Sequence, residues 1–206
     1  MLRSQNATFN VIYNIRNMAN ILFDIKNKND FYHWLEEYSQ IETECFVHVK
    51  KGKPIDNDVF YYLDAVEVAL CFGWIDSSQL VIEGKRYQRF SPRRKNSYWT
   101  ELNKERVRRL DKLGLLTPQG KKILPKMGKR SFKFDDEFIS ILKQHRVYKK
   151  FTSFHPLYQR VKASNLAFYK KRDPLTYNKM LDHLLKETRK GKMFGEWNDY
   201  GRLLNY

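Results

Sequence analysis

CFGWIDSSQLVIEGKRYQRFSPRRKNSYWTELNKERVRRLDKL, residues 71–113, is the stretch that decides the predicted fold. It follows an apolar run typical of a buried helix, and Gly73 is placed to end that helix in the left-handed conformation. Glu83–Gly84 lies between two segments of alternating polarity and predicts a two-residue hairpin turn. A basic loop follows, and Ser97 is predicted to cap an amphipathic helix. Aromatic and arginine side chains therefore converge on one region from several elements.

Upstream of this stretch, short strands alternate with amphipathic helices. Alternating or β-branched residues predict strands at 21–24 and 44–50. Apolar residues spaced three and four apart predict helices at 29–38 and 58–72. Strands and helices of this length are typical of a small sheet that packs against helices.

Downstream, only helical periodicity remains. Asp135, His155–Pro156 and Asp173–Pro174 are typical first residues of helices, because a polar cap or a proline is favoured there. The expected fold class is therefore α+β, with a small antiparallel sheet packed with helices, followed by an all-helical C-terminal segment.

The basic segment 128–133 is interpreted as a linker between these parts. We expect an N-terminal extension at 1–20, an α+β domain at 21–127 and a helical segment at 134–206. Met18 heads a stretch that would serve as a start of its own, so the extension is interpreted as the result of an upstream start-site choice.

Composition favours a folded protein in a reducing compartment. The chain has 206 residues, of which 15% are aromatic, enough for a packed core without disulfides. No apolar run reaches the roughly 18 residues of a membrane span, and the first residues do not have the pattern of a signal peptide. Cys45 and Cys71 are expected to be buried free thiols, and the expected location is the cytoplasm.

The net charge of +16 is unevenly distributed along the chain. Residues 1–82 hold 7 basic and 11 acidic residues, whereas residues 83–130 hold 16 and 4, and residues 131–206 hold 16 and 8. Such a basic excess attracts phosphorylated ligands or polyanions. A merely solvated basic surface is an equally weighted alternative.

The motifs FGWIDS, at 72–77, and RFSPRRKNSYWTELNKERVRRLDKLGLLTPQG, at 89–120, resemble the YdeI/OmpD-associated family of small bacterial proteins. The resemblance extends over about residues 21–124 and implies a stress or bacteriocin-protection protein that acts by binding, with no established reaction. The C-terminal residues depart from the family pattern. The matching positions are Phe72, Gly73, Trp74, Asp76, Arg89, Pro92, Arg93, Ser97, Trp99, Asn103 and Arg106.

Seven of these side chains form the candidate site for a small phosphorylated or otherwise anionic ligand. Arginines supply forked donors to an anion, and a tryptophan supplies a stacking surface. The alternative is a structural network in which Asp76 pairs with an arginine. The candidate ligand-binding residues are Trp74, Asp76, Arg89, Arg93, Trp99, Asn103 and Arg106.

In the helix predicted to follow Ser97, the spacing of the residues places two groups of side chains on different faces. Asn103 and Arg106 are three residues apart, so they share a face, on which Trp99 is also expected. Glu105 is expected to pair with Arg108 and Arg109 on the solvated face.

Basic residues interleaved with aromatic ones on the hairpin also fit a nucleic-acid binder, which stacks bases while it contacts phosphates. No known nucleic-acid-binding motif accompanies them. The candidate residues for this alternative are Arg86, Arg89, Arg93, Arg94 and Lys95.

An enzyme acting on a small anionic substrate is a further alternative. No second carboxylate stands near Asp76 in the sequence, and no nucleotide-binding or nucleophile motif is present. The five histidines and two cysteines lack metal-ligand spacing, so neither a metal nor a cofactor is expected.

Overall fold

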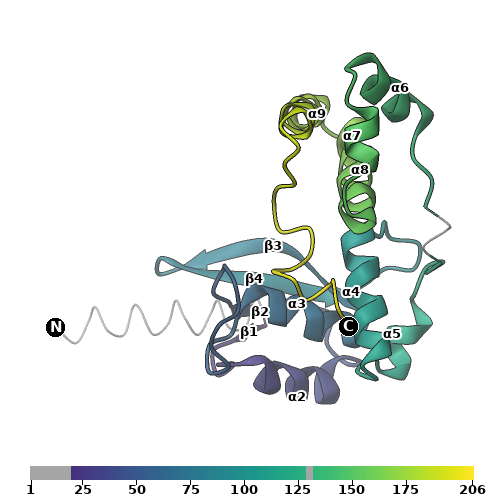
Figure 1. Cartoon of the computed structure of the whole chain (residues 1–206). Helices are drawn as coiled ribbons and strands as arrows, with labels where there is room; N and C mark the ends of the chain where they lie inside the picture. Colours follow the sequence, from purple (N-terminus) through teal and green to yellow (C-terminus); the bar gives the residue numbers. More distant parts are fainter. Residues whose placement is uncertain (1–19, 129–131) are drawn as a thin grey trace. The chain divides into compact units, whose positions relative to one another are not determined.

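The computed structural model describes residues 20–128 and 132–206, and its elements group into two compact units (Figure 1). Residues 20–97 and 114–124 form the sheet unit, and the other described residues form the helical unit. The predicted α+β class is confirmed. The extension predicted at 1–20 and the alternative start at Met18 fall, apart from Asn20, outside the described residues.

The sheet unit contains a four-stranded sheet in the order β1-β2-β4-β3. The strands are β1 (Ile21–Leu22), β2 (Cys45–His48), β3 (Trp74–Ile82) and β4 (Lys85–Pro92). Strands β3 and β4 form the predicted hairpin, and both turn residues have positive φ, 47° at Glu83 and 75° at Gly84.

The sheet is mixed, whereas the sequence predicted an antiparallel one. Strand β1 pairs with β2 in parallel, and the other neighbours are antiparallel. The chain passes from β1 to β2 through helix α2 (Lys28–Tyr38), and a helical crossover of this kind is what connects parallel neighbours.

Helices α2 and α3 (Tyr62–Cys71) build the core of the sheet unit. The Phe31 ring is fully buried, with its centroid 5.3 Å from that of Phe90 in β4 and 5.5 Å from that of Phe60. Gly73 ends α3 with φ 77°, as predicted. Helix α5 (Pro118–Lys122) packs against the end of α3, because a Cβ added at Gly120 would lie only 2.2 Å from the backbone oxygen of Cys71.

The helical unit consists of α4 (Glu101–Lys112), α6 (Asp136–Gln144), α7 (Tyr148–Thr152), α8 (Pro156–Lys170), α9 (Pro174–Arg189) and the C-terminal tail. Asp135, His155 and Asp173 cap α6, α8 and α9, as predicted. Ser97 as the cap of α4 is wrong: Thr100 fills that position, and its hydroxyl accepts from the Asn103 N–H.

The core of the helical unit draws on its four C-terminal helices and on the tail. Its largest fully buried members include Tyr158, Phe151 and Leu184, and Trp197 and Leu203 of the tail belong to the same cluster. Residues 98–113, which include α4, group with this unit, whereas the sequence placed them in a domain at 21–127. Among the described helices, none has the length and apolarity that a membrane crossing requires.

Candidate functional site

Asp76 and Arg93 of the predicted site lie in the sheet unit. Asp76 is half-buried in β3 and its Oδ2 accepts a hydrogen bond from the Tyr62 hydroxyl at 2.6 Å. Arg93 follows β4, and its backbone N–H donates to the Gly73 oxygen at 2.9 Å. Burial lowers the pKa of the Arg93 guanidinium to about 10, although the negative charge of Asp76 opposes that shift. The two side chains thus interact electrostatically where the end of α3 meets the hairpin.

Arg89 is engaged within the sheet unit. Its Nε lies 2.6 Å from the Glu44 carboxylate, and its Nη1 donates to the Ser77 hydroxyl at 3.0 Å. Arg86, Arg94 and Lys95 are exposed. The five residues predicted to bind nucleic acid therefore differ in their accessibility, because three face solvent, Arg89 forms an ion pair and Arg93 is buried. The nucleic-acid role of the hairpin stays a prediction.

The two tryptophans of the predicted site are buried. Trp74 is 1% exposed, its indole N–H donates to the Ser39 oxygen at 3.2 Å, and its ring packs edge-on against Trp34. Trp99 precedes α4, so its predicted place on the helix face with Asn103 is wrong. Both rings are core residues of the fold.

Arg106 of α4 binds a carboxylate that the sequence did not reveal. Its Nε and Nη2 donate to the two carboxylate oxygens of Asp199 at 2.7 and 2.8 Å, and its Nη1 donates to the Asn103 side chain at 2.8 Å. Arg106 is 9% exposed and Asp199 is 2% exposed. The anion that this arginine holds is therefore the protein's own carboxylate, 93 residues away in sequence.

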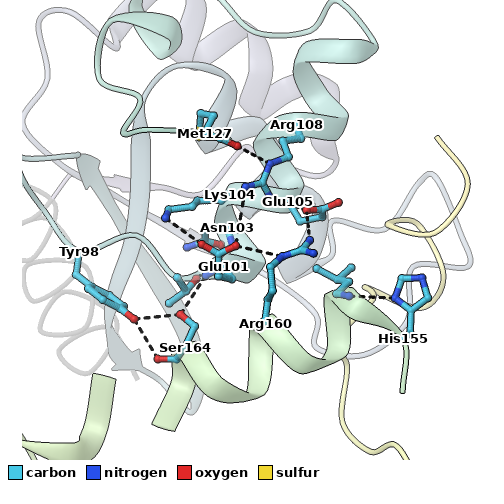
Figure 2. A network of polar contacts seen from close by, with 12 residues as sticks. Tyr98, Glu101, Asn103, Lys104, Glu105, Arg108, Met127, His155, Arg160 and Ser164 are labelled. Atoms are coloured by element: carbon cyan, nitrogen blue, oxygen red, sulfur yellow. Dashed lines mark hydrogen bonds and ion pairs between the residues drawn. The ribbon is translucent and has the colours of Figure 1, made fainter. Parts of the chain in front are cut away.

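A second face of α4 forms a buried ion-pair network with α8 (Figure 2). The Glu105 carboxylate lies 2.5 Å from Arg108 Nη1 and 3.0 Å from Arg160 Nη2. Glu101 lies 3.4 Å from Arg160 Nε. Both carboxylates are at most 3% exposed, so the prediction that Glu105 lies on a solvated helix face is wrong. Long-range pairing with α8 buries this face.

Ser164 of α8 links the same network to the start of α4. Its hydroxyl accepts from the Glu101 backbone N–H at 3.2 Å, and the Tyr98 hydroxyl donates to its backbone oxygen at 3.0 Å (Figure 2). These bonds satisfy polar groups at the N-terminus of α4. They also fix the position of α4 against α8.

A cavity of about 550 Å³ opens beside this network, within the helical unit. Its wall combines polar and apolar side chains from α4, from the start of α8 and from the tail. The lining residues are Glu105, Arg108, Lys112, His155, Pro156, Leu157, Arg160, Leu203, Leu204 and Tyr206.

Several lining side chains bring hydrogen-bond donors to the cavity, among them Lys112, His155 and Arg160. Lys112 Nζ bonds the backbone oxygen of Tyr206 at 2.5 Å and has further donors. His155 Nδ1 accepts from the Leu157 N–H at 3.2 Å, so the neutral ring carries its proton on Nε2. Arg160 contributes a guanidinium at the end of a side chain that is 12% exposed. These groups can donate to an anion.

The Tyr206 hydroxyl extends the network at the cavity wall. It donates to Glu105 Oε1 at 2.8 Å. Burial and the neighbouring Glu105 carboxylate raise the pKa of Tyr206 to about 12, so the phenol stays protonated at neutral pH. Neither Tyr206 nor His155 belonged to the candidate site predicted from sequence; the basic residues of α4 were the only local signal for this region.

The described residues contain no group of three or more His, Cys, Asp or Glu side chains placed to hold a metal ion. Cys45 and Cys71 are buried and free, as expected, and burial raises the pKa of the Cys45 thiol.

Comparison with known families gives a match over the first half of the chain. Residues 23–123 are similar to a family described as a domain of unknown function (DUF8412). The matched range covers most of the sheet unit and α4, and does not reach α6 to α9. No curated protein and no solved structure matches the chain.

Proposed function

We propose that the protein binds a small anion with an apolar part, a phosphorylated or carboxylated metabolite, in the cavity beside α4 and α8. The cavity volume of about 550 Å³ supports this proposal. It lies within the range of roughly 300–1,000 Å³ that small-molecule sites occupy. Cationic donors and aliphatic side chains meet in it, as an amphipathic anion requires.

The charges around the cavity support an anion of low charge. The carboxylates of Glu101 and Glu105 are within 4 Å of both Arg108 and Arg160, so the two arginines are largely neutralised. Lys112, whose Nζ bonds the Tyr206 oxygen at 2.5 Å, is then the main remaining source of positive charge at the cavity, which favours a monoanion over a polyanion.

The apolar side of the cavity supports the second part of the ligand. Leu157, Leu203 and Leu204 contribute aliphatic surface there, and Leu204 is 39% exposed. An inorganic anion would leave this surface in water, whereas an aromatic or aliphatic group on the ligand would cover it. A binding role of this kind agrees with what the resemblance to the YdeI/OmpD-associated family implies.

The proposal is tested by thermal denaturation with phenyl phosphate, benzoate and inorganic phosphate at constant ionic strength. A ligand that binds only the folded chain raises the free energy of unfolding by RT ln(1 + [L]/Kd), and the melting temperature rises as a result. We expect an increase with phenyl phosphate or benzoate that exceeds the increase with inorganic phosphate. Lys112→Gln should abolish it, and Lys179→Gln, an exposed lysine of α9 that does not line the cavity, should leave it unchanged.

Two results would overturn the proposal. One is the absence of any increase with either organic anion. The other is an increase that Lys112→Gln and Lys179→Gln reduce equally, because that would indicate a response to net charge alone.

A further inference from the structure

Two segments of the helical unit bring their cations together at a site away from the cavity. The first is the turn from α6 into α7, residues 143–150, and the second is the end of α9, residues 186–192. Lys150 Nζ bonds the Arg189 backbone oxygen at 2.7 Å, and Arg189 Nη2 lies 3.1 Å from His145 Nδ1. We call this surface the α7–α9 basic face. Its cations are Lys143, Arg146, Lys149, Lys150, Lys186, Arg189, Lys190 and Lys192.

The face has almost no compensating negative charge. All eight cationic side chains are exposed, and Glu187 is the one carboxylate in the two segments. Glu187 forms an ion pair of 2.7 Å with Lys190. Cations at the end of α9 interact favourably with the helix dipole, but the α6–α7 turn adds four more beside them. Mutual repulsion among these charges is what a bound polyanion would relieve.

The face has the composition expected for phosphate contacts and lacks the composition expected for a membrane surface. Neither segment exposes a large apolar side chain. A helix that lies on a membrane needs an apolar face to insert beside its cations. Lysines and arginines on a turn and a helix end can contact the phosphates of a nucleic acid without reading its bases.

We propose that the α7–α9 basic face binds the phosphodiester backbone of nucleic acid, without sequence specificity. The face shares no residue with the lining of the cavity or with the hairpin. Each phosphate contact releases counterions from the nucleic acid, so affinity should fall linearly on a plot of log K against log salt concentration.

The experiment measures fluorescence anisotropy of labelled, mixed-sequence single-stranded RNA and double-stranded DNA with the full chain over a range of salt concentrations. The test variant is Arg146→Gln/Lys149→Gln/Lys192→Gln, whose three side chains make no bond within the described structure. We expect affinity at about 0.1 M salt to fall at least about tenfold, and the salt slope to become shallower by about two to three. The two probes show whether one strand or a duplex is preferred.

The matched control is Arg86→Gln/Arg94→Gln/Lys95→Gln, which removes the same charge from the hairpin and should change affinity by less than about threefold. Three outcomes would overturn the proposal. They are absence of binding to both probes at low salt, an equal loss in both triple variants, and a loss confined to the hairpin variant. In the first of these outcomes, binding to vesicles containing phosphatidylserine would assign the face to membranes.

Discussion

The pair of Arg106 and Asp199 offers the sharpest test of how the helical unit is held together. Asp199→Asn preserves the shape of the side chain and tolerates the positive φ of 49° at this position. It replaces one acceptor oxygen by an amide that cannot accept from the guanidinium. Arg106 would lose one of two charge-assisted bonds of 2.7 and 2.8 Å and keep its charge in a buried place.

The expected cost follows from these losses. A hydrogen bond to a charged group contributes about 1.5–3 kcal/mol, and breaking one partner of a buried ion pair costs about 3–5 kcal/mol. We therefore expect Asp199→Asn to lower the free energy of unfolding by about 3 kcal/mol or more. The measurement is urea denaturation followed by circular dichroism, because the affected unit is helical.

A double variant and a control make this result decisive. Arg106→Met/Asp199→Asn removes both charges, so it should be less destabilised than the sum of the two single variants by more than about 1 kcal/mol. Glu137→Gln is the control. The Glu137 side chain is 60% exposed and pairs with Lys170, so its loss should lower the free energy of unfolding by less than about 1 kcal/mol. A loss below about 1 kcal/mol for Asp199→Asn, or additive losses in the cycle, would refute the reasoning.

Three further variants or treatments test other parts of the fold. Burial lowers the pKa of Lys162 to about 8, so the unfolded chain binds this proton more tightly and stability should rise as pH rises above about 8. Lys162→Met should therefore be more stable than the wild type at pH 7, by a margin that shrinks towards pH 10; a constant margin in urea denaturation would contradict this. Gly120→Ala should lower the free energy of unfolding by about 1–3 kcal/mol or more, because the new Cβ meets the Cys71 oxygen. Gly128→Ala is the control, since its Cβ meets nothing within 4 Å, and should cost less than about 0.5 kcal/mol. Equal urea midpoints for the two variants would contradict the packing of α5. Ellman's reagent should leave Cys45 and Cys71 unmodified in the native protein and modify both in denaturant, and fast native labelling would contradict their burial.

Local signals in the sequence predicted the elements well. Gly73 ends a helix and Glu83–Gly84 forms the hairpin turn because each needs a backbone conformation that its immediate neighbours specify. Asp135 and Asp173 cap helices for a similarly local reason, since a side-chain oxygen binds N–H groups two or three residues ahead.

The candidate site was less predictable, because its pairings are long-range. Glu105 stands at helical spacing from Arg108, which predicts a solvated pair, and nothing nearby reveals that Arg160 will cover it. Asp199 binds Arg106 across 93 residues, so a site assembled from neighbouring motif residues assigned that arginine to an external anion. Periodicity identifies the face of a helix, and it does not identify which distant element covers that face.

The path of the chain has a consequence for dividing the protein. Residues 98–113 join the helical unit, the chain then returns to the sheet unit at 114–124, and it leaves again at 125. No single cleavage point separates the two units. A fragment ending at Leu124 would contain the whole matched segment, yet its α4 would lack Arg160, Ser164 and Asp199. Glu105 and Arg106 would then lose the long-range ion pairs that bury them in the full chain. The segment that matches the family, residues 23–123, therefore does not coincide with either compact unit of the fold.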